Sequence, residues 1–264
     1  MKSVLASGLA VAALAALLTS AAPAFADPPA GLEVRFCPEQ VARAYPLDSL
    51  HQVQSLLLQN VAVVNRGAPA EVTAVTIELL RGGEVVDSRR IEGAALQAAV
   101  KGGQGLKASG MLDALGFQFC EGRLTGGANP GASPTLAANE SLLVFQQPFA
   151  WKGARDQVRA RVSALVDGKQ VEASAALPID ATTSKTQFRF PLAKGRWLIA
   201  AASSFHTPHR WGVPEEFALD IIAVGPDGLS HKGDGARHAD FWAYGAPVVA
   251  AADGVVVRVE AEGP

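Results

Sequence analysis

The 264-residue sequence carries little charge, and the charge it carries is nearly balanced. Only 18% of its residues are charged, and 23 Lys and Arg stand against 25 Asp and Glu. A formal net charge of −2 offers no basic surface for a polyphosphate partner, which excludes nucleic-acid binding. With 49% hydrophobic residues, the chain is too apolar to be disordered or a coiled coil as a whole. We expect one or two packed cores.

The sequence also lacks a convincing membrane span. Residues 4–18 are almost wholly apolar and follow Lys2, but this run is shorter than the roughly 20 residues of a spanning helix. Ala24-Phe25-Ala26 then fits a small-x-small cleavage pattern. We therefore interpret residues 1–26 as a signal peptide. The mature protein is expected to be exported, either periplasmic or extracellular, with no stable membrane span after cleavage.

Cysteine is scarce, since only Cys37 and Cys120 occur. Two cysteines without a nearby histidine exclude a zinc finger. In an exported protein such a pair favours a disulfide, and two separately buried thiols are the alternative.

Residues 27–180 show mostly period-two patterning, which is typical of β-strands. Val75, Ile77 and Leu79 share one face before the turn at residues 81–84, and residues 158–166 alternate sharply before an Asp167-Gly168 turn. Between these two hairpins, residues 93–119 are rich in Ala and Gly and are expected to hold a short helix. The fold class is mainly β, and this region resembles an immunoglobulin-like β-sandwich.

A polar, Thr-rich linker at residues 181–187 separates this domain from a second one at residues 188–264. The second domain contains four of the five histidines, together with several carboxylates, which is the ligand set that zinc prefers. The four are His206, His209, His231 and His238, and we expect the last two to be rim or solvent residues.

Asp220 is the only polar residue in the β-type run of residues 217–224. A carboxylate on an apolar face needs a cation or several hydrogen-bond donors. Asp220 is thus either a metal ligand or an acceptor of backbone N–H groups at a strand end. Further on, residues 244–259 are expected to form a strand, an Asp253-Gly254 turn and a returning strand.

These residues carry a resemblance to a known family. The order of Phe217-Ala218-Leu219-Asp220, Tyr244-Gly245-Ala246-Pro247-Val248 and Ala252-Asp253-Gly254-Val255-Val256 resembles the first half of the lysostaphin-like (LytM-type) zinc metallopeptidases. The resemblance covers about residues 190–260. It implies an antiparallel β-core, bound zinc and, in active members, cleavage of peptide crosslinks in peptidoglycan.

The resemblance also implies ligands. Asp220 matches the family's aspartate ligand, and His209 is our first choice for the early histidine, with His206 as the alternative. Many members have that histidine four residues before the aspartate, where this chain has Glu216, which is a further possible ligand. Trp242 and Tyr244 either line a substrate groove or pack in a core.

The family's His-x-His motif, which supplies a ligand and a catalytic histidine, does not occur in the 264 residues. We therefore assign no catalytic residue, expect the sequence to be truncated before that motif, and expect the chain by itself to be inactive. Three interpretations remain open: a zinc endopeptidase acting on peptidoglycan peptides, a non-catalytic LytM-like protein that binds peptidoglycan or regulates a hydrolase, and a β-sandwich adhesion or carbohydrate-binding protein.

Overall fold

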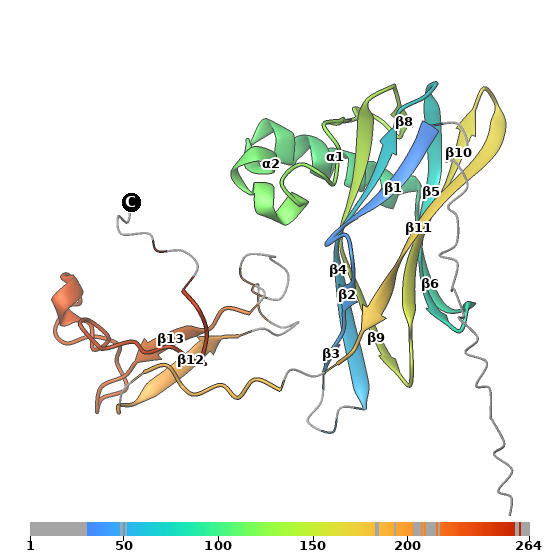
Figure 1. Cartoon of the computed structure of the whole chain (residues 1–264). Coiled ribbons are helices and arrows are strands. Elements are labelled where there is room, and N and C mark those ends of the chain that lie inside the picture. The colour runs from blue at the N-terminus through green and yellow to red at the C-terminus, as the bar shows by residue number, and fades with distance from the viewer. Residues whose placement is uncertain are drawn as a thin grey trace, which may run out of the picture.

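The computed structural model describes residues 31–47, 50, 52–182, 185–192, 194–202, 207, 209, 215, 217–256 and 259. The signal-peptide prediction for residues 1–26 lies outside these residues, as do His206 and Glu216. The described chain is mainly β, as expected, with three sheets and a few helices (Figure 1). None of its helices combines the length and the apolar character needed to cross a membrane.

Two sheets share the main core. The first has the order β1-β4-β9-β7, with β3 paired to β4, and the second has the order β2-β11-β10-β5-β6, with β8 paired to β5. Most pairs are antiparallel, whereas β2 with β11 and β7 with β9 are parallel. The strands of the first sheet are β1 (Leu32–Cys37), β3 (Tyr45–Pro46), β4 (Val53–Asn65), β7 (Asn129–Pro130) and β9 (Glu140–Lys152). Those of the second are β2 (Ala42–Arg43), β5 (Ala70–Arg81), β6 (Glu84–Glu92), β8 (Thr135–Leu136), β10 (Gln157–Val166) and β11 (Lys169–Asp180).

Both hairpins predicted from alternation are present. Val75, Ile77 and Leu79 on β5 are fully buried, and a Gly82-Gly83 turn leads into β6. On β10 the alternate residues from Val158 to Val166 are buried in the same core, before the Asp167-Gly168 turn. The alternation predicts burial well on β10, where one face is covered by the other sheet, whereas β5 is buried on both faces over most of its length.

The predicted helix between the hairpins is also present, and it is longer than expected. The helical segments are α1 (Gly93–Ala108), α2 (Met111–Ala114) and η2 (Gly116–Phe119). They lie against the first sheet, beside β9, where a second apolar cluster forms (Figure 1). Because helices cover the outer face of β4, this strand is buried on both faces for most of its length.

The two cysteines are joined in a disulfide, with 5.8 Å between the Cα atoms of Cys37 and Cys120. The bond fastens the end of β1 to the residue after η2 and closes a separation of 83 residues. Closing a loop of this length stabilises the fold by about 4 kcal/mol in the chain-entropy model.

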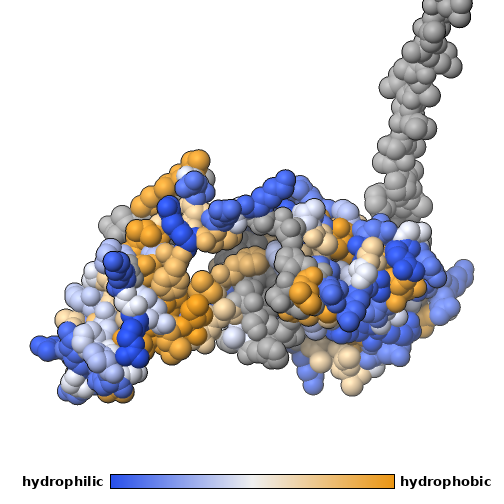
Figure 2. Space-filling model, turned by 90° about the horizontal axis from the view of Figure 1, so that it is seen from below, coloured by the Kyte–Doolittle hydropathy of each residue, from blue (hydrophilic) through white to orange (hydrophobic). Residues whose placement is uncertain are grey.

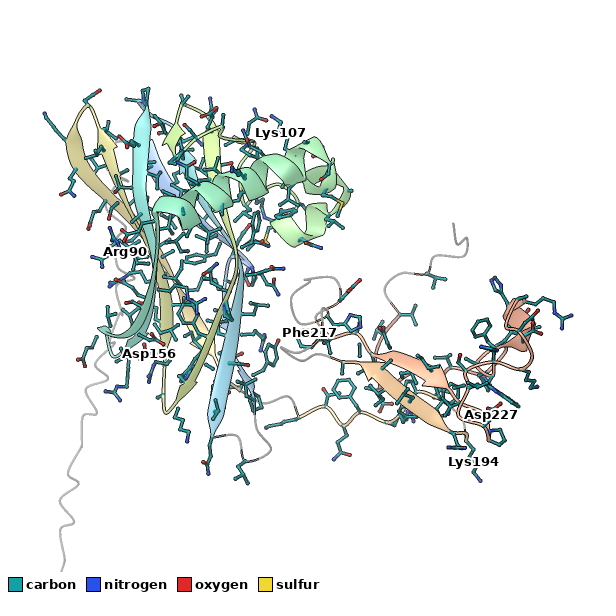
Figure 3. All side chains as sticks on the ribbon, turned by 180° about the vertical axis from the view of Figure 1, so that it is seen from behind. Arg90, Lys107, Asp156, Lys194, Phe217 and Asp227 are labelled. Atoms are coloured by element: carbon teal, nitrogen blue, oxygen red, sulfur yellow. A yellow bond between two sulfur atoms is a disulfide. The ribbon has the colours of Figure 1, made fainter. Side chains whose placement is uncertain are left out.

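The third sheet pairs β12 (Trp197–Ala201) with β13 (Asp220–Ala223) in antiparallel fashion. It lies beside the two larger sheets rather than within them (Figure 1). The rings of Tyr45 and Phe217 meet edge to face at 5.3 Å between centroids, and Phe217 points toward the larger sheets (Figure 3). The last helical element is η5 (His238–Asp240).

Two predictions about this C-terminal part are wrong. The strand expected at residues 217–224 is only Asp220–Ala223, because a hydrogen bond from Ala218 N to Glu215 O turns the chain just before it. The strands expected within residues 244–259 are absent from the described part of that segment, where only a bridge between Leu192 and Val248 forms. A strand needs a neighbour to satisfy its backbone, and these residues have none over most of their length.

The unpaired segment leaves apolar side chains in solvent. Val248 and Val255 are 73% and 87% exposed, and β12 exposes Leu198 and Ile199. Hydrophobic residues gather on this part of the molecule in Figure 2. Alternation and β-propensity alone did not distinguish a paired strand from an exposed extended segment.

Candidate metal centre

The start of β13 holds the first member of the candidate site. Asp220 is the first residue of β13 and pairs with Ala201 at the end of β12, next to an irregularity in the register. The second member, His209, lies in the segment between these two strands. Because β12 and β13 pair, the two ends of the segment that connects them lie close together, and His209 belongs to that segment.

The structure places His209 and Asp220 in direct proximity. The Nε2 atom of His209 is 3.1 Å from Oδ1 of Asp220. Despite this distance, the buried Nε2 atom has no hydrogen-bond partner among the described residues, since the angles do not suit a hydrogen bond. Two ligands of a tetrahedral zinc ion lie about 3.4 Å apart when each is about 2.0–2.2 Å from the metal. A buried, unpartnered ring nitrogen beside a carboxylate oxygen therefore fits a shared cation.

A third group, Glu215, orients the imidazole from the other side. Its Oε2 atom is 3.2 Å from Nδ1 of His209. A carboxylate there accepts a hydrogen bond from Nδ1–H, and this leaves Nε2 with a lone pair that a cation can use. Metal-binding histidines usually have such a partner, because it fixes the ring and the tautomer.

These carboxylates also change the proton affinity of the imidazole. Burial lowers the pKa of His209, but the adjacent carboxylates of Asp220 and Glu215 favour the protonated ring and outweigh burial, so the pKa of His209 is raised above its ordinary value. The pair of carboxylates thus attracts positive charge at the ring, whether it comes from a proton or from a metal ion.

The cluster is buried on one side and open on the other. The His209 side chain is only 9% exposed, whereas Asp220 and Glu215 are 57% and 59% exposed. The sequence placed Asp220 on an apolar face, where a carboxylate needs a partner, but its exposure to solvent relieves most of that need. Strand β13 has no further neighbour beyond β12 in the described structure, so nothing covers its first residue. The open side gives a ligand or a further protein group access to Asp220.

The other candidates of the C-terminal part do not join this cluster in the described structure. The ring of Trp242 lies 4.3 Å from Nζ of Lys232, and Tyr244 is 65% exposed. His231 contacts the ring of Phe241, and His238 begins η5. The described residues contain no group of three or more His, Cys, Asp or Glu side chains arranged to hold a metal.

Sequence reasoning missed Glu215 as a partner of the histidine. It drew attention to Glu216, because that residue occupies the position of the family's usual histidine. The relevant signal is weak, since a spacing of six residues between His209 and Glu215 has no regular geometry in an irregular segment.

Comparisons with known proteins add little. No family model and no curated protein matches the chain. Among solved structures, the chain is similar to an engineered protein determined by crystallography, at 11% sequence identity and a TM-score of 0.24. That similarity covers 56% of this chain and 20% of the other. A similarity this low carries no conclusion about fold or function.

Proposed function

We propose that the protein is an exported, LytM-type zinc metalloendopeptidase that acts on peptide crosslinks of peptidoglycan, with His209 and Asp220 as two of its zinc ligands. One observation carries the proposal. The buried Nε2 of His209 lacks a hydrogen bond and lies 3.1 Å from Asp220 Oδ1. The family resemblance and this geometry select the same two residues. The two larger sheets would then be an immunoglobulin-like module placed before the peptidase domain.

The proposed location outside the cytoplasm has its own support. Residues 1–26 have the sequence of a signal peptide, and the Cys37–Cys120 disulfide is of the kind that persists in oxidising compartments.

Each residue of the cluster has a distinct task in this proposal. Asp220 would supply negative charge to the metal from the start of β13, and His209 would supply a neutral nitrogen. Glu215 holds the Nδ1 proton, so that Nε2 stays free to bind. When bound, zinc polarises a scissile carbonyl and lowers the pKa of a water molecule.

Catalysis needs groups beyond these. The family's third ligand and its catalytic histidine come from a His-x-His motif, which the 264 residues do not contain. We therefore expect these residues to bind zinc without hydrolysing peptidoglycan, and we expect hydrolysis only from a form that carries such a motif.

The alternative function is that of a non-catalytic LytM-like protein. In a non-catalytic LytM-like protein the fold binds peptidoglycan or regulates another hydrolase. Such a protein would sediment with purified peptidoglycan and release no peptides from it.

Zinc content provides the test. Because only two protein ligands are proposed, we expect zinc to bind weakly: titrated into the metal-free chain, it should saturate at about one zinc per molecule, and Asp220→Asn should abolish this binding. Asp253→Asn is a matched control, because Asp253 is fully exposed and its nearest cation, on Arg189, is 3.8 Å away. Absence of zinc from the wild-type chain, or equal zinc in Asp220→Asn, would refute the proposal.

A further inference from the structure

A cavity in the sandwich is not used by the proposed zinc chemistry. It has a volume of about 390 Å³ and lies where β2, β4 and β11 approach the Cys37–Cys120 disulfide. Leu56, Leu58 and Leu177 supply much of its apolar wall. Its volume falls in the range of small-molecule pockets, which is roughly 300–1,000 Å³.

A buried polar group without a partner among the described residues lines the cavity. Gln59 lines it and is only 6% exposed, and its Nε2 atom has no hydrogen-bond partner among the described residues. Two other lining residues are engaged: Arg43 donates to Asp180 at 2.6 Å, and the backbone carbonyl oxygen of Gln118 accepts from Asn60 at 2.7 Å. A buried donor without an acceptor is costly, and native proteins rarely leave one.

The backbone is irregular at this glutamine. Leu58 pairs with Gln147 and Asn60 with Phe145, whereas Gln59 is left out of the β4–β9 register. On β4 the side chains that face the main core are those of even-numbered residues before this point, Leu56 and Leu58, and those of odd-numbered residues after it, Val61 and Val63. Departures from a regular ladder often re-aim a side chain near a binding site. Here the irregular position is the one that carries the unpartnered amide.

We propose that this cavity binds a small molecule or a peptide end that has an apolar body and a carbonyl-type oxygen, and that this oxygen accepts a hydrogen bond from Gln59 Nε2. The apolar wall suits the body of such a ligand, and the amide suits its oxygen. The required acceptor is either a neutral carbonyl or a carboxylate. The site is independent of the zinc ligands, so each proposal can fail without the other.

Two probes of similar shape test the acceptor without any mutation. Acetophenone has the carbonyl oxygen, and ethylbenzene does not. In titrations of the isotope-labelled, disulfide-bonded chain by NMR, acetophenone should shift the signals of residues 56–59 and the Leu177 methyl groups. It should bind about tenfold more tightly than ethylbenzene, as one hydrogen bond to a buried donor allows. Benzoate then distinguishes a carboxylate ligand from a neutral one, by binding more or less tightly than acetophenone.

A variant pair isolates the glutamine. Gln59→Met keeps the length of the side chain and should remove the preference for acetophenone, whereas Gln104→Met, at an exposed position of α1, should retain it. The inference is overturned if ethylbenzene binds wild type as tightly as acetophenone, if the shifted signals map away from the cavity, or if acetophenone fails to bind up to its solubility limit. Should Gln59→Met not fold, the comparison of the two probes on wild type still decides the matter.

Discussion

Replacing Glu215 by Gln should weaken zinc binding without removing a zinc ligand. Glu215 lies 3.2 Å from Nδ1 of His209 and, in our account, accepts the proton that leaves Nε2 free for the metal. A glutamine has the same shape, but its oxygen is a weaker acceptor and carries no charge. The amide can also present its NH₂ group to Nδ1, and this would favour the wrong tautomer of the ring.

The expected magnitude follows from the exposure of the carboxylate. Loss of a partner that orients a metal-binding histidine typically lowers affinity about 10–100-fold. Because Glu215 is 59% exposed, water competes for its contact, and we expect the lower end of that range. Competition with a chromophoric chelator at constant pH measures the zinc affinity of wild type, Glu215→Gln and the control Asp253→Asn. An unchanged affinity in Glu215→Gln would refute the orienting role, and so would a loss as complete as that of Asp220→Asn.

Three further predictions concern protons, a buried charge and the disulfide. A proton competes with zinc for His209, and the pKa of His209 is raised, so zinc affinity should fall as the pH is lowered. The fall should begin at a higher pH than for a histidine with an ordinary pKa. Calorimetric titrations with zinc at several pH values measure this, and a pH-independent affinity would contradict it. Glu78 is 2% exposed and forms ion pairs with the half-exposed Arg159 and Arg161. Glu78→Gln should therefore lower the free energy of unfolding, measured in urea, by about 2 kcal/mol. The control Glu71→Gln, at an exposed position, should lower it by no more than about 0.5 kcal/mol, and equal effects of the two variants would contradict the prediction. Replacing Cys37 and Cys120 together by Ser should cost about 4 kcal/mol in the same assay, and a cost below about 1 kcal/mol would show that the cross-link contributes little.

The β-sandwich part of the fold was largely accessible from sequence. Strand β10 has one covered face, so the period-two pattern of residues 158–166 reports burial directly. The Asp167-Gly168 turn was also accessible, because both residues adopt positive φ angles, 50° and 72°, which this residue pair tolerates. Local chemistry and packing agree there.

In the C-terminal part, the sequence drew attention to His209 and Asp220, which lie close together, but not to the fold around them. The pattern of residues 244–259 indicates strands, but a strand also requires a neighbour, and no local signal shows whether one is present. The histidine and the aspartate were found because their residue types and order suggest zinc. Glu215 was not found, since its contact with His209 depends on the path of an irregular segment that carries no periodicity.

An anomalous diffraction experiment at the zinc absorption edge, on crystals of the protein grown with zinc, tests the central claim most directly. Our account predicts one ion within about 2.0–2.2 Å of both His209 Nε2 and Asp220 Oδ1. A hydrogen bond between these two side chains with no metal peak, or a zinc ion bound elsewhere, would contradict it.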